Sequence, residues 1–111
     1  MTENKLADMS TEFAVKILNL TDGIKGHYSL TNQLERSGTS IGANIREAFY
    51  AHSKADFIAK LQIALKECSE SEYWLELLIE SGYYSDKSIL DRCIEIKKIL
   101  ISSINTSKNG K

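Results

Sequence analysis

The chain has 111 residues, a formal net charge of -1 and 42% hydrophobic residues, which fits a single domain over residues 1–111 with one core. This near neutrality excludes a dedicated polybasic binder but leaves room for a local basic patch. No apolar run reaches the roughly 20 residues of a membrane span, and the first residues lack the pattern of a signal peptide, so we expect a cytoplasmic protein with no membrane partner.

Long helices are the expected structure throughout the chain. The sequence contains no proline, although average usage of about 5% would give five or six in this length. A first helix is predicted from about residue 4 to 21, and Gly23 and Gly26 mark its end. Its apolar stripe consists of Leu6, Met9, Phe13, Ile17 and Leu20.

A second helix is predicted to start near Ser29, a plausible N-cap, and to end before Ser53. It contains a run of small residues that includes Gly38 and Gly42. Each glycine costs a helix about 1 kcal/mol relative to alanine, so a helix with both must gain from a close approach to a neighbour. The run therefore predicts tight packing between helices.

The third helix has the most regular apolar pattern in the sequence. Ser53, with Asp56 three residues later, is typical of a capping box that opens a helix, and Gly82 is typical of a helix stop. Between them, spacings of three and four residues predict a heptad seam. The seam consists of Phe57, Leu61, Ala64, Cys68, Ser71, Leu75 and Leu78.

The fourth helix is predicted to begin after a cap at Ser85 and to reach about Thr106, with a frayed tail from about Ser107. Its apolar surface is wider than one stripe, which indicates contact between subunits. The two rows are Ile89, Cys93, Ile96 and Leu100, and Leu90, Ile94 and Ile101. Four such helices with short connections predict an all-α, antiparallel up-down-up-down four-helix bundle that forms a homo-oligomer.

Reactive side chains show no pattern of a catalytic or metal site. Neither His27 nor His52 follows a Glu-x-x-His pattern, so we expect no metal, no cofactor and no enzymatic activity. Cys68 and Cys93 are predicted to be offset by about five residues, or roughly 7 to 8 Å, along antiparallel helices. With the distance between helix axes added, a disulfide is out of reach, and both cysteines are expected to be reduced core fillers.

Polar residues near the small-residue run have two possible roles. Arg36, Ser40, Asn44 and Glu47 could form a buried network that hydrogen-bonds across helices and fixes their register. The alternative is a ligand-binding site. The sequence favours the structural network.

Basic residues gather in the fourth helix, whereas the third helix is acidic. Lys87, Arg92, Lys97 and Lys98 could pair within the chain with acidic residues of the third helix. Alternatively, a ring of subunits could repeat them around a rim and create a phosphate-binding surface. Aromatic residues such as Tyr50 and Tyr73 could stack on bases, although they more often seal cores or interfaces.

Four segments resemble a known bacterial family. They are Tyr28 to Leu34, Ser40 to Ala48 with its Ser-Ile-x-x-Asn-Ile-x-Glu core, Ser53 to Phe57, and Ile63 to Leu65. They are similar to the four-helix-bundle proteins of intervening sequences in 23S ribosomal RNA genes. The resemblance implies a homopentameric ring, and it extends to the accessory protein of diversity-generating retroelements, whose basic ring binds nucleic acid and a reverse transcriptase.

The function expected from the sequence is a non-enzymatic oligomeric interaction module. Its partner would be structured RNA or DNA, or a protein bound to nucleic acid. The alternative is a purely structural or protein-binding scaffold ring without nucleic-acid contact. Two departures from the family pattern, at Ala48 and at Lys66-Glu67-Cys68, indicate a subfamily.

Overall fold

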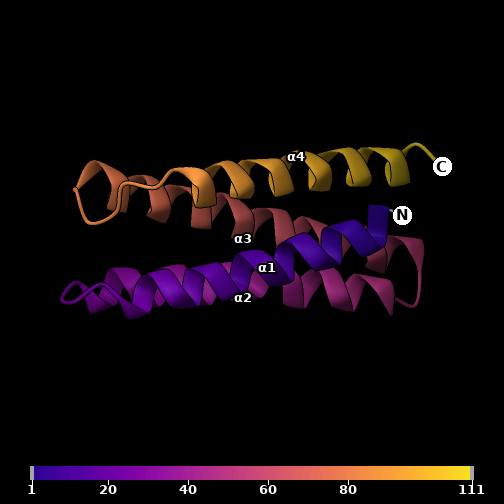
Figure 1. Cartoon of the computed structure of the whole chain (residues 1–111). Coiled ribbons are helices and arrows are strands. Elements are labelled where there is room, and N and C mark those ends of the chain that lie inside the picture. The colour runs from indigo at the N-terminus through magenta and orange to yellow at the C-terminus, as the bar shows by residue number, and fades with distance from the viewer. Residues whose placement is uncertain (1, 111) are drawn as a thin grey trace.

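The protein folds into four long helices, as a computed structural model shows for the backbone of residues 2–110 and the side chains of residues 5–110 (Figure 1). Each helix packs against the next one in the chain, and α4 closes the bundle against α1 over the least extensive of the four contacts. The predicted all-α antiparallel four-helix bundle is confirmed. The helices are α1 (Thr2–Asp22), α2 (Tyr28–Phe49), α3 (Lys54–Glu80) and α4 (Ser88–Lys108).

The bundle is elongated, with extents of 45 × 20 × 19 Å, and its two ends differ. The α2–α3 turn lies at one end with the start of α1 and the end of α4, and we call this the turn end (Figure 1). The α1–α2 and α3–α4 connections lie at the other end, the loop end. There the imidazole Nε2 of His27 hydrogen-bonds to the hydroxyl of Tyr83, which joins the two connections.

The core consists of the apolar stripes that helical spacing predicts. Leu20, Phe57 and Leu90 lie at its margin, partly buried, whereas Ile101 of the second row of α4 is 42% exposed. No helix of the described chain is long and apolar enough to cross a membrane. The largest fully buried side chains are Phe13, Ile17, Leu34, Ile41, Ile45, Leu61, Leu75, Leu78, Ile96 and Leu100.

The two glycines of α2 lie in its contact with α1. A Cβ added at Gly38 would lie 3.2 Å from two side-chain carbons of Ile17. A Cβ at Gly42 would lie 3.2 Å from the Oγ of Ser10, which is itself buried. These distances are tighter than ordinary van der Waals contact. The small-residue run is therefore a helix-packing surface, as predicted.

The predicted boundaries of α3 are confirmed at both ends. The Oγ of Ser53 accepts the N–H of Asp56 at 3.0 Å, which caps the first turn. Gly82 adopts a φ of 82°, and the N–H of Tyr83 bonds to the carbonyl of Leu78 at 3.0 Å. This Schellman geometry needs a left-handed residue, which glycine adopts without strain.

The predicted caps of α2 and α4 are wrong. Helix α2 starts at Tyr28, one residue before the expected cap, after a left-handed His27 whose side chain makes no cap bond. At α4 the N-cap is Lys87, whose side chain makes no cap bond, and the carboxylate of Asp86, the residue before it, accepts the N–H of Ser88 at 2.9 Å. Helix α4 also runs two residues past the predicted Thr106, so fraying from residue 107 is not observed.

The predicted separation of the two cysteines is also wrong. The Sγ atoms of Cys68 and Cys93 lie 3.6 Å apart, although both are fully buried core residues as expected. The prediction assumed that the third and fourth helices both extend to a turn near Tyr83. Instead, α3 continues for twelve residues past Cys68, whereas α4 begins only five residues before Cys93. Helix α3 thus overhangs α4 by about 10 Å, which places the cysteines at one level.

Candidate functional site

The basic residues predicted to bind nucleic acid do not form one patch on α4. Lys87 and Lys98 are both exposed, and their spacing of eleven residues is about three helical turns. These two side chains therefore share a face but lie about 16 Å apart along it. The other two members of the set, Arg92 and Lys97, point to different sides of the helix.

Both of these other charges are paired within the chain. The Nζ of Lys97 lies 2.6 Å from the Oε1 of Glu72 on α3, and this hydrogen bond raises the pKa of Lys97. An Nη of Arg92 lies 3.6 Å from the Oε1 of Glu95, one turn away on α4. Among the described side chains, pairing with the acidic third helix, one of the two roles expected for this basic stretch, thus occurs at Lys97, whereas Arg92 pairs within α4.

The motif residues of α2 form a ladder along one side of that helix, not a buried network. The Oγ of Ser40 donates to the carbonyl of Arg36 at 2.7 Å, and the Nδ2 of Asn44 donates to the carbonyl of Ser40 at 2.9 Å. Short polar side chains in helices often bond back in this way. Arg36 and Glu47 are exposed, and Glu47 alone of the four links to α3 in the described structure, through Lys60 at 3.3 Å.

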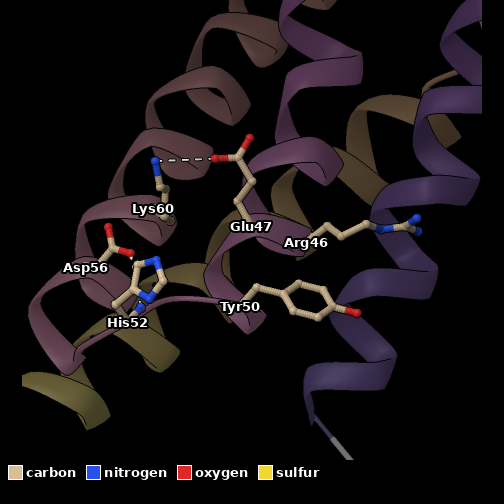
Figure 2. A pocket seen from close by; sticks show the side chains of 6 residues that line it. All are labelled: Arg46, Glu47, Tyr50, His52, Asp56 and Lys60. Atoms are coloured by element: carbon tan, nitrogen blue, oxygen red, sulfur yellow. Dashed lines mark hydrogen bonds and ion pairs between the residues drawn. The ribbon is translucent and has the colours of Figure 1, made fainter.

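A pocket of about 360 Å³ opens at the turn end, between the end of α2 and the start of α3 (Figure 2). The ion pair of Glu47 and Lys60 spans one side of it, and the N–H of His52 bonds to the carboxylate of Asp56 at 3.4 Å. The residues that line this turn-end pocket are Arg46, Glu47, Tyr50, His52, Asp56 and Lys60.

Two side chains of the turn-end pocket are available for an outside ligand. Arg46 and Tyr50 extend together, away from Lys60, and Tyr50 is 80% exposed (Figure 2). Among the described side chains, Arg46 has no ion-pair partner. A guanidinium can hold a phosphate or carboxylate through two parallel hydrogen bonds, and a phenol ring can stack on a base. The pair therefore suits an anionic ligand with a flat group.

Sequence reasoning named Tyr50 but did not single out Arg46 as a candidate binding residue. Arg46 lies in the family-like segment between Ile45 and Glu47, where the pattern pointed to helix packing. The charges of the turn-end pocket come together only through the geometry of the α2–α3 turn. No spacing in the sequence shows that Lys60 pairs with Glu47, or that Arg46 has no ion-pair partner among the side chains of residues 5–110.

A second hollow, of about 450 Å³, lies between α3 and α4 near the loop end, and we call it the loop-end groove. Its apolar surface comes from Leu77, Leu90 and the ring of Tyr73, which is 53% exposed. Glu76 and Glu80 make its rim acidic. The full lining is Tyr73, Glu76, Leu77, Ile79, Glu80, Lys87 and Leu90.

Within residues 5–110, no group of three or more His, Cys, Asp or Glu side chains is placed to hold a metal ion. The thiol of Cys93 is hydrogen-bonded to Cys68 and buried, and both effects raise the pKa of Cys93 far above its usual range. A protonated, buried thiol is a poor nucleophile.

Comparison with known proteins agrees with the fold and the motif. A model of the family described as 23S rRNA-intervening sequence protein matches residues 2–102. A crystal structure at 1.70 Å, of a protein with unknown function from the S23 ribosomal protein family of Bacteroides thetaiotaomicron VPI-5482, is 51% identical. That match has a TM-score of 0.88 and covers 95% of this chain and 99% of that chain. No curated protein matches significantly. The chain belongs to the family of 23S rRNA-intervening sequence proteins.

Proposed function

We propose that this protein is a non-enzymatic interaction module that works in the cytoplasm as an oligomer of identical chains. The loop-end groove carries the proposal, because Tyr73, Leu77 and Leu90 form an apolar surface there that the single chain leaves open. Exposed aromatic and aliphatic side chains in a hollow are typical of protein contacts. A second copy of this chain is the occupant that we infer.

The distribution of charge supports a second copy in the groove. We divide the bundle into two halves at the level of the contact between the two cysteines. The loop-end half has five basic and eight acidic side chains, whereas the turn-end half has eight basic and six acidic ones. A ring needs two different, complementary patches on each subunit. The acidic rim of the groove can serve as one of them, and a pentamer is the size that the family resemblance implies. The loop-end half comprises residues 15–38 and 69–92, and the turn-end half residues 5–14, 39–68 and 93–110.

The absence of enzymatic activity is part of the proposal. The turn-end pocket combines cations and carboxylates, but its one cross-helix pair, Glu47 with Lys60, is a surface ion pair. The protonated thiol of Cys93 lies in the core, away from both hollows. Binding chemistry accounts for these features without a reaction.

Binding of structured RNA or DNA is the activity that we infer for the assembled module. The carrying observation is the exposed pair of Arg46 and Tyr50 at the turn end, because a ring would repeat this pair once per subunit. Repeated phosphate contacts raise affinity and make it strongly dependent on salt. Sequence preference should be slight, because no element of the bundle resembles a base-reading motif. A protein bound to nucleic acid could use the same surface.

A scaffold ring without nucleic-acid contact is the second candidate. The ion pairs of Lys97 with Glu72 and of Arg92 with Glu95 favour it, because they occupy half of the basic set on α4. Under this alternative, the charges of α4 stabilise the subunit, and the oligomer binds proteins alone.

A salt titration with three charge-reversal variants separates these alternatives. We expect the unmodified protein to bind structured ribosomal RNA and a random duplex at about 50 mM salt and to release both as salt rises. Arg46→Glu should abolish binding, whereas Arg36→Glu, which makes the same charge change on α2, should weaken it only slightly. Loss of binding in Lys98→Glu alone would place the contact on α4. No binding by the unmodified protein would favour the scaffold.

A further inference from the structure

The two cysteines form the closest contact between reactive groups in the core. The Sγ atoms of Cys68 on α3 and Cys93 on α4 lie 3.6 Å apart, and the two residues are 25 positions apart in the sequence. Each thiol also lies against the backbone of the other residue. The Sγ of Cys68 is 3.2 Å from the carbonyl oxygen of Cys93, and the Sγ of Cys93 is 3.4 Å from that of Cys68.

This mutual contact places the two sulfur atoms within a short movement of a disulfide. The two side chains converge from facing helices, and their sulfur atoms need to approach by about 1.5 Å to reach bonding distance. Rotation of two short side chains with a small shift of α4 can supply such a movement. Helix α4 is the element suited to shift, because its contact with α1 is the least extensive in the bundle.

We propose that Cys68 and Cys93 are a modification site, at which a peroxide converts the two thiols into an intramolecular disulfide that joins α3 to α4. One thiol gives up its proton, its thiolate attacks a peroxide oxygen, the O–O bond breaks, and the sulfur becomes a sulfenic acid; the hydroxide that leaves takes up the proton and departs as water. The second thiol gives up its proton in the same way, its thiolate attacks that sulfur, the S–O bond breaks, and the hydroxide that leaves takes up this proton as the second water. Two thiols and one hydrogen peroxide thus give one disulfide and two waters.

Burial makes the first oxidation slow in the closed bundle. The step that forms the disulfide is then intramolecular. Both thiols are fully buried and the thiol of Cys93 is held protonated, so the peroxide reacts when α4 opens locally. After the first sulfur is oxidised, closure of α4 returns the second thiol to contact with it. The cross-link then forms faster than a second oxidation of the same sulfur.

The test uses the full chain, folded, with hydrogen peroxide as the probe. Trypsin cleavage after Lys66 and Arg92 places the two cysteines on different peptides, residues 67–87 and 93–97. We expect the intact mass to fall by two hydrogens and these peptides to be linked until a reductant is added. Because the bond closes a long chain segment, the thermal midpoint of the oxidised protein should rise by several degrees.

Cys93→Ser and Cys93→Ala are the matched controls, and two are needed in case a buried hydroxyl impairs folding. In a folded control, Cys68 should gain oxygen atoms and form no link within the chain. Three results would overturn the proposal. The first is that both thiols remain free although glutathione added to the same tube is fully oxidised. The second is a sulfinic acid at one cysteine without a link, and the third is a link between two chains.

Discussion

Gly42 shows how one residue sets the distance between two helices. Its missing side chain leaves room for Ser10, whose Oγ would lie 3.2 Å from an added Cβ. The serine uses this hydroxyl within α1, where it donates to the carbonyl of Ala7 at 3.0 Å. The contact therefore consists of a small polar side chain on α1 and a residue without a side chain on α2, which permits close packing.

Gly42→Leu should destabilise the protein although it raises helix propensity. The isobutyl group would overlap Ser10 and force α1 and α2 apart, which should lower the free energy of unfolding by more than about 1 kcal/mol. Ala43→Leu is the matched control, because Ala43 is exposed one residue later on α2 and should change stability little. Urea denaturation measures both. An unchanged or raised midpoint for Gly42→Leu would show that the packing surface can relax.

At the scale of elements, helix interiors could be predicted better than helix ends. The heptad seam of α3 is local in the sequence, so its buried face from Leu61 to Leu78 could be read from spacing alone. The caps of α2 and α4 could not, because left-handed His27 and the carboxylate of Asp86 compete with nearby serines for the same role. The sequence also did not show that α3 extends past the start of α4 at the connection of residues 81–87, so the two cysteines were predicted to lie too far apart.

The carboxylate of Asp86 stabilises the start of α4, and this stabilisation depends on pH. The backbone N–H of Ser88 is the main cause that lowers the pKa of Asp86, and Lys16 adds a favourable charge. Because the folded pKa lies below the unfolded value of 3.8, this stabilisation is present above that value and is lost as pH falls through the folded pKa.

Asp86→Ala should therefore lower the thermal midpoint at neutral pH, and the difference from the unmodified protein should disappear at pH values below the folded pKa. Ser85→Ala is the control, since Ser85 is not the cap. Melting curves over a range of acidic pH measure both variants. Equal midpoints at neutral pH would mean that another group satisfies the amide of Ser88.

At the scale of the whole molecule, the fold could be predicted almost completely and the candidate site only in part. The helical spacing of the apolar residues and the lengths of the four segments determine a four-helix bundle, and the family motif points to the same architecture. The turn-end pocket depends on which charges neutralise each other in space, so sequence reasoning placed the basic set on α4 and missed Arg46. The loop-end groove likewise combines Tyr73 with Leu90, from two helices whose relative register was not known.

Assembly through the loop-end groove should depend on Tyr73. Tyr73→Glu adds a charge beside Glu76 and Glu80, so it should dissociate the oligomer while helix content stays unchanged. Tyr28→Glu is the matched control, because Tyr28 is 63% exposed on α2 and lies outside the groove. Light scattering and circular dichroism measure mass and helix content. A dissociated Tyr28→Glu with an intact Tyr73→Glu would move the interface away from the groove.

Self-association is the central claim, and sedimentation equilibrium of the unmodified protein at micromolar concentration tests it most directly. We expect a single species whose mass is a small multiple of the 12.5 kDa chain, and five copies is the number that the family resemblance implies. A particle with the mass of one chain across the whole concentration range would contradict it.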